Sequence, residues 1–271
     1  MPQTVEHQFE RMTVGMVLDR AFRLYSQNFP LMFGITAVLN VPLLIVTAWP
    51  LLMVIVGSRP SIVAAATVSL GLTGLALLII YPLVTAAITK AVSDRYLGNG
   101  VTVQSALKEA WASVGTLLLT QFVVGVMVAV GFLLLFVPGI LWTLSYALVP
   151  SVVMLEASDR RNMHMNRSEI RRRSWELVRG NRGKVFVVLM VFVLMQICLS
   201  TGATWIAGMG LDSTSDVGSS IESIIRQVIA IVISPLQTIA ITLLYYDFRI
   251  RKEGFDLEML SQAIGGPTVN A

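Results

Sequence analysis

The chain has 271 residues, of which 55% are hydrophobic and only 13% are charged, and its mean hydropathy is +0.74. Soluble domains carry about a quarter charged residues, so this composition excludes an ordinary soluble globular protein. The formal net charge is +4. The basic residues that produce it border long apolar segments, which favours the membrane surface over nucleic acid as their partner.

Six long apolar segments follow one another along the chain, and we expect each to cross a membrane as a helix. They cover residues 31–56, 62–89, 114–137, 140–155, 185–211 and 227–246. A spanning helix needs about 20 mainly apolar residues, a length that only the fourth segment does not reach. The first segment is too long for the apolar part of a signal peptide, so we expect it to remain as a membrane anchor. Pro138 and Gly139 predict the tight external turn between the third and fourth segments.

A short amphipathic segment comes before each pair of apolar segments, so the chain contains an internal repeat of three copies. The copies cover approximately residues 13–97, 102–160 and 166–258. A repeat on this scale predicts a single membrane domain over residues 1–271, built as three helical hairpins. The sequence therefore predicts an all-α integral membrane protein with six transmembrane helices, in which an amphipathic interfacial helix precedes each hairpin.

The three short segments have the period of amphipathic helices. In the third copy, Ile170, Ser174 and Leu177 form one stripe, and charged residues occupy the opposite face. Such short, charged helices lie in the headgroup plane of a membrane rather than crossing it. Asn166 and Glu169 predict the start of this helix, because each side chain can satisfy the backbone N–H of the other residue.

The distribution of basic residues predicts the orientation of the chain. All 20 Lys and Arg residues except Arg59 and Arg226 fall in the N-terminal segment, in residues 90–113 and 156–184, or in the C-terminal tail. Because basic residues accumulate in cytoplasmic loops, we expect both termini and all three interfacial helices to be cytoplasmic.

The Arg-rich collar, which we define as residues 160–184, carries nine basic residues. Each base near an anionic membrane surface contributes about 1 kcal/mol to binding, so the collar predicts contact with anionic lipid headgroups or with a membrane-protein partner. The candidate contact residues are Arg171, Arg172, Arg173, Trp175, Arg179 and Arg182. A structural collar that sets the tilt of the spanning helices is the alternative. We also expect an ion-pair network of Glu176, Asp247 and Arg249 to join the third copy to the C-terminus.

Residues suited to catalysis or metal binding are scarce. His7 and His164 are the only histidines, and neither has a second ligand at metal-binding spacing. Cys198 is the only cysteine, so the chain cannot form a disulfide or a cysteine cluster within itself. The sequence has no phosphate-cradling loop and no nucleophile elbow. We therefore expect no catalytic site, no metal, no cofactor and no enzymatic activity.

The apolar segments have no acidic or basic residue near their centres, which argues against transport through a charged relay. Their polar residues include Gln121 and Gln237, and side chains of this kind most often hold helices together. Pro82 and Pro235 occupy equivalent repeat positions and should kink or break their helices. A shared kink accounts for the pair. A cavity near them would support the alternative function, a carrier or flippase-like transporter of a lipid-like or amphiphilic molecule.

Three stretches resemble a known family. Residues 173–182, RSWELVRGNR, and residues 245–258, YYDFRIRKEGFDLE, are similar to bacterial proteins identified as the membrane domain of glycerophosphoryl diester phosphodiesterase. Residues 14–25 match the usual opening of that family, although Met16 stands where a Glu is common. The resemblance covers roughly residues 13–260.

The resemblance implies a stand-alone domain of the bacterial inner membrane. In the fusions that give the family its name, a separate barrel domain carries out the hydrolysis, and its metal-binding Glu and His residues have no counterpart in this sequence. We therefore predict a non-enzymatic, multi-pass inner-membrane protein that contacts anionic lipid or a protein partner through its cytoplasmic Arg-rich collar.

Overall fold

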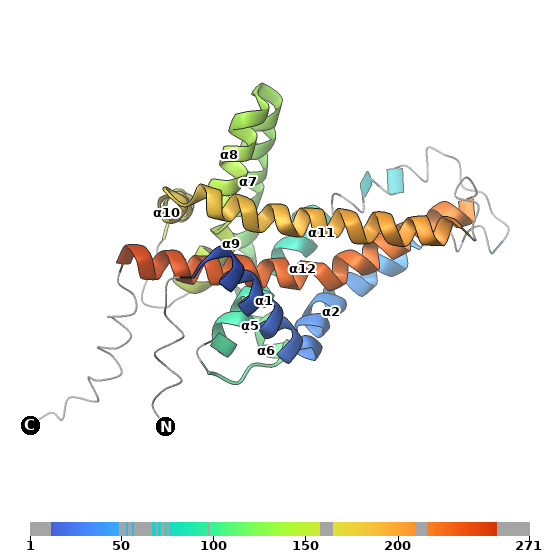
Figure 1. Ribbon diagram of the computed structural model, residues 1–271, viewed down its shortest axis with the longest axis horizontal. Helices are drawn as coiled ribbons and strands as arrows, with labels where there is room; N and C mark the ends of the chain where they lie inside the picture. Colours follow the sequence, from blue (N-terminus) through green and yellow to red (C-terminus); the bar gives the residue numbers. More distant parts are fainter. Residues whose placement is uncertain are drawn as a thin grey trace, which may run out of the picture.

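The structure is a computed structural model, and all regular elements in its described residues are helical (Figure 1). It describes residues 12–48, 76–96, 98–157, 165–209 and 216–253, together with residues 53, 56, 67, 68, 70, 71 and 74. The elements are α1 (Val14–Gln27), α2 (Phe29–Thr47), the π-helix η2 (Ala76–Ile80), α5 (Tyr81–Tyr96), α6 (Val103–Ala112), α7 (Val114–Leu134), α8 (Phe136–Tyr146), α9 (Val149–Val152), the π-helix η3 (Val153–Ala157), α10 (Arg167–Val178), α11 (Arg182–Gly208) and α12 (Asp216–Glu253).

Within the described residues, four helical stretches are long and apolar enough to cross a membrane. They are Val114–Leu134, Phe136–Ala157, Arg182–Gly208 and Val217–Glu253, and they overlap the third to sixth predicted segments. The first two predicted segments, residues 31–56 and 62–89, fall partly outside the described residues. Within them, α2 and α5 are helical. The chain is thus an all-helical protein of membrane type over its described residues, and the total of six spans stays a prediction.

Three short helices occupy the positions expected for the amphipathic segments. Helices α1, α6 and α10 begin directly after Thr13, Thr102 and Asn166, and each side chain of these three residues accepts a hydrogen bond from the first turn of its helix. Asn166 and Glu169 form the reciprocal cap that the sequence predicts. The predicted stripe of α10 faces inward, with Ile170 and Ser174 both fully buried.

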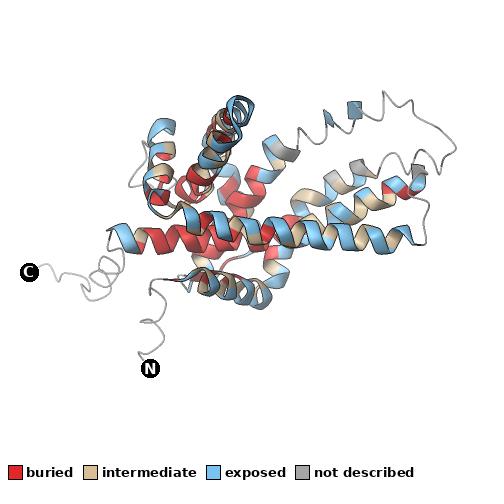
Figure 2. Cartoon of the chain, turned by 45° about the horizontal axis from the view of Figure 1, so that its top comes forward, coloured by how far each residue is buried: buried red, intermediate tan, exposed pale blue. Residues whose placement is uncertain are grey.

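Helix α12 is the centre of the fold. It packs against α1, α2, α5 and α11, and most of its residues between positions 231 and 250 are buried (Figure 2). Helices α7 and α11 instead expose most of their apolar side chains, as expected for helices that face lipid. Pro235 does not break its helix, since α12 continues on both sides of it, and a kink there stays a prediction. Pro82 is the second residue of α5, which begins directly after η2.

Helices α7 and α8 form a hairpin that stands steeply away from the α11–α12 pair (Figure 1). The predicted turn at Pro138 and Gly139 is wrong. The chain reverses at Leu135, and Pro138 lies in the first turn of α8, where its missing N–H costs no hydrogen bond. Gly139 lies so close to Phe132 that a Cβ at this position would be 2.5 Å from the ring. The glycine therefore serves close packing of the hairpin and not the turn.

Candidate functional site

Asp247 is fully buried on α12 and joins three parts of the chain. Its Oδ2 accepts hydrogen bonds from Lys184 Nζ of α11 at 2.6 Å and from Arg251 Nε at 2.9 Å. Its Oδ1 accepts one from the backbone N–H of Met12 at 2.7 Å. The two basic side chains also donate to the Met12 carbonyl. A buried carboxylate needs this degree of compensation, and the cluster fastens the start of α1 to α11 and α12.

Glu156, in the π-helix η3, forms a second buried cluster. Its Oε2 accepts from Arg173 Nε of α10 at 2.8 Å, and its Oε1 accepts from the Tyr245 hydroxyl of α12 at 2.8 Å. Arg173 also pairs with Glu253, which in turn pairs with Arg249 at 3.1 Å. Burial opposes the charged guanidinium, but the hydrogen bond and charge of Glu156, with Glu253, raise the pKa of Arg173. Arg173 therefore stays charged and ties α10 to η3 and α12.

These two clusters, which we call the charged junction, differ from the network that the sequence predicts. Asp247 pairs with Lys184 and Arg251, Arg249 pairs with Glu253, and Glu176 pairs with Arg172 at 3.3 Å. The side chain of Lys252 donates to the backbone carbonyls of Glu176 and Arg179 and so caps the end of α10. Asp247 and Arg249 thus belong to the charged junction, whereas Glu176 pairs within its own helix.

The candidate contact residues of the collar divide into two groups. Arg173 is paired with Glu156 and Glu253 in the charged junction. The Arg182 guanidinium lies 4.4 Å from the centre of the Trp175 ring, and the Arg182 Nε has no hydrogen-bond partner among the described residues. Arg172 is exposed and has only its pair with Glu176 within the collar. For Arg171 and Arg179, the described part of the chain offers no carboxylate partner.

A cavity of about 250 Å³ lies where α5, α7, α8, α9, α11 and α12 meet. Most of its described lining residues are polar in type and uncharged, although carbon atoms make up most of the surface that they expose: Tyr81, Thr85, Thr89, Gln121, Thr143, Tyr146, Ser151, Gln237 and Thr238. Ser151 is fully buried, and its hydroxyl has no hydrogen-bond partner in the described structure. Neither Pro82 nor Pro235 belongs to this described lining, but their near neighbours Tyr81 and Gln237 do.

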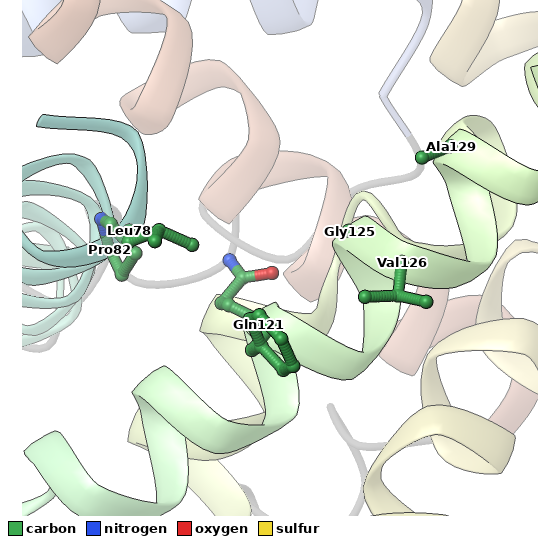
Figure 3. Close-up of a pocket in the computed structure, with 7 residues that line it drawn as sticks. Leu78, Pro82, Gln121, Gly125, Val126 and Ala129 are labelled. Carbon is green, nitrogen blue, oxygen red and sulfur yellow. The ribbon is translucent and has the colours of Figure 1, made fainter. Parts of the chain in front are cut away.

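A second, apolar groove of about 350 Å³ adjoins the cavity (Figure 3). Leu78 and Pro82 form one wall, and α7 forms the other with Gly125, Val126 and Ala129. Gln121 lines both the groove and the cavity, and Figure 3 shows its amide rising from α7 toward the opposite wall. The sequence identified Gln121 as a polar residue in an apolar segment but could not show that it faces open space.

The described residues contain no group of three or more His, Cys, Asp and Glu side chains that could hold a metal ion. His7 and His164 lie outside those residues. Cys198 is exposed. The charged junction can hold helices together, and the cavity can accept hydrogen bonds and donate them.

The chain has no match among protein families, curated proteins or solved structures. The resemblance to the membrane domain of glycerophosphoryl diester phosphodiesterase therefore rests on the sequence motifs alone.

Proposed function

We propose that this protein is a non-enzymatic, multi-pass protein of the bacterial inner membrane that binds anionic lipid headgroups through its Arg-rich collar. The observation that carries the proposal is the stacking of Arg182 on Trp175 at the start of α11. Trp and basic side chains together are typical anchors at a membrane interface. The apolar residues that follow on α11 are exposed, among them Phe186, Val187, Met190 and Val193.

Charge availability supports lipid as the ligand of the collar. Arg173 and Lys184 are neutralised by buried carboxylates, so they hold the fold together and are not free to bind a headgroup. Arg171 and Arg179 have no such partner in the described residues, and Arg182, whose Nε is buried, carries no carboxylate pair among them. Guanidinium groups in this state suit phosphate oxygens, with which they form charge-assisted hydrogen bonds. A membrane-protein partner is the other ligand that such a surface could bind.

Native mass spectrometry of the purified full-length protein tests this proposal. We expect phosphatidylglycerol to bind more tightly than phosphatidylcholine. Replacing Arg171, Arg172 and Arg179 together with Gln should weaken phosphatidylglycerol binding about 100-fold, because each base contributes about 1 kcal/mol.

Two single substitutions provide the comparison. Arg179→Gln, in the collar, should weaken phosphatidylglycerol binding about fivefold. Arg226→Gln, outside the collar and near the start of α12, is the matched control and should leave the binding unchanged. Equal phosphatidylglycerol affinity in the triple variant and the parent protein would contradict a lipid-binding collar.

A second candidate function is supported by the cavity. A carrier of a lipid-like or amphiphilic molecule needs a site with polar groups between its helices, and the cavity, with the adjoining groove that Pro82 lines, supports this alternative. Movement of a fluorescent lipid between the leaflets of proteoliposomes tests this function, and an unchanged rate relative to protein-free vesicles would exclude it for that lipid.

A further inference from the structure

The polar cavity and the apolar groove share Gln121, and their other walls meet at the consecutive residues Tyr81 and Pro82. We propose that they form one binding site for a neutral, single-chain amphiphile, whose uncharged hydrogen-bonding head occupies the cavity and whose apolar chain occupies the groove. The site is independent of the collar. It would supply the ligand-binding site for the second candidate function, the carrier, and any transport role of the site rests on that function.

The polar half of the site is lined by the hydroxyl and amide groups of Thr, Tyr and Gln side chains. The Ser151 hydroxyl has no hydrogen-bond partner in the described residues, but it is fully enclosed and does not face the open space of the cavity. Other hydroxyls of the lining already donate within their own helices, such as Thr85 to the Pro82 carbonyl at 2.9 Å and Thr143 to the Gly139 carbonyl at 2.8 Å. Their oxygens can still accept a hydrogen bond. A ligand with hydroxyl or amide groups would satisfy this lining.

The size of the cavity limits the head of the ligand. Its volume of about 250 Å³ equals roughly eight water molecules at ~30 Å³ each. A head of glycerol or small-sugar dimensions fits this space, and a branched, multi-ring head does not. Two acyl chains would also exceed the groove, which is bounded by one face of α7 and by Leu78 and Pro82.

The lining selects against a charged head. No acidic or basic side chain belongs to the described lining of the cavity or of the groove. The charge nearest along the chain is Lys90, which follows the lining residue Thr89 and is paired with Asp94 and Glu109. Glu156, five positions after Ser151, is paired with Arg173 in the charged junction. A phosphate or ammonium group in the cavity would lose its hydration without gaining a counter-charge, which is a large cost. The head is therefore uncharged.

The apolar half of the site is open along α7. A Cβ added to Gly125 would meet no heavy atom within 4 Å, so the space above this glycine is free (Figure 3). The opposite wall carries Leu78 from the π-helix η2. Single π-turns of this kind occur frequently at functional sites, because the wider turn reorients the following side chains. The groove thus continues the polar cavity with a surface suited to an acyl chain.

Photo-crosslinking of the full-length protein in nanodiscs tests the site. The probe is a monoacylglycerol with a diazirine in its acyl chain, and we expect it to label α7 near Gly125. Unlabelled monooleoylglycerol should compete at least tenfold better than lysophosphatidylglycerol, which has a similar chain and an anionic head. Equal competition by the two would overturn a site for neutral heads, and the absence of competable labelling would show that the cavity holds water only.

Variants separate the two halves of the site. Gln121→Leu and Gln237→Leu should each weaken competition by monooleoylglycerol roughly two- to tenfold, since each removes one hydrogen bond to the head. Gly125→Leu should abolish labelling by filling the groove. Its matched control is Gly115→Leu on the same helix, where a Cβ would also meet nothing within 4 Å. Gln196→Leu on α11, outside the described lining, controls for loss of an amide.

The proposal fails if Gly125→Leu and Gly115→Leu are labelled equally. Circular dichroism and gel filtration of each variant establish that it is folded. Labelling that survives without any acceleration of monoacylglycerol movement in proteoliposomes would exclude the carrier function and leave the binding site intact.

Discussion

The charged junction and the polar cavity differ in how completely their buried polar groups are hydrogen-bonded. At the junction, Asp247 and Glu156 each accept hydrogen bonds from several donors, and all of these donors except Arg251 lie outside the helix of the acceptor. In the cavity, the lining is uncharged, and the Ser151 hydroxyl is left without a partner in the described structure. Satisfied buried groups hold a structure together, whereas unsatisfied ones cost stability unless something binds them. From this difference we expect the junction to serve folding, whereas binding in the cavity is our proposal.

Asp247→Asn should produce the largest loss of stability. The substitution leaves Lys184 and Arg251 close together without a counter-charge, so we expect the free energy of unfolding to fall by about 3–5 kcal/mol. Thermal unfolding in nanodiscs, followed by Trp fluorescence, measures the effect. Asp19→Asn is the control, because its pair with Arg23 is about two-thirds exposed and should contribute little. Similar losses for the two variants would remove Asp247 from the centre of the junction.

Glu156→Gln should have a smaller effect at the second cluster. The amide can still accept from the Tyr245 hydroxyl, and Arg173 keeps its pair with Glu253. We therefore expect the free energy of unfolding to fall by about 1–3 kcal/mol, the cost of one weakened charged hydrogen bond. The same unfolding measurement applies, with Glu222→Gln near the far end of α12 as control. A loss as large as that of Asp247→Asn would mean that the two clusters are equally essential.

Local features of the fold could be predicted from the sequence. The starts of α1, α6 and α10 follow from capping residues and from a helical period, both of which depend only on neighbours along the chain. The apolar length of α7, α11 and α12 likewise predicts helices long enough to cross a membrane. The prediction of a turn at Pro138 and Gly139 was wrong because Pro is equally compatible with the first turn of a helix.

The partners within the site could not be predicted. Asp247 binds the backbone of Met12, which is 235 positions away in the chain, and no local pattern encodes that contact. Glu156 carried a weak signal, as the carboxylate that ends an apolar segment. Gln121 and Gln237 are of a residue type that most often holds membrane helices together, yet both line the cavity. Whether a polar residue joins helices or faces a cavity depends on the three-dimensional packing.

Two buried serines show the same contrast between a hydrogen-bonded and an unpaired polar group. The Ser174 hydroxyl of α10 donates to the Ser145 carbonyl at 2.8 Å, whereas the Ser151 hydroxyl has no partner in the described residues. Ser174→Ala should lower the free energy of unfolding by about 0.5–1.5 kcal/mol, and Ser151→Ala should leave it unchanged or raise it slightly. Both values come from unfolding in nanodiscs without added amphiphile. A larger loss for Ser151→Ala would show that its hydroxyl has a structural role.

Arg172→Gln should have the smallest effect, although its neighbour Arg173 is central to the junction. The Arg172 side chain is 76% exposed, and its pair with Glu176 spans one helical turn, an arrangement that contributes only about 0.3–0.5 kcal/mol. Arg173 is 26% exposed and bridges Glu156 and Glu253. Arg172→Gln should therefore preserve stability while weakening phosphatidylglycerol binding, and Arg173→Gln should mainly lower stability. If the two variants lost the same stability, the division of the collar into structural and lipid-binding arginines would be wrong, because exposure would then not determine the role of each side chain.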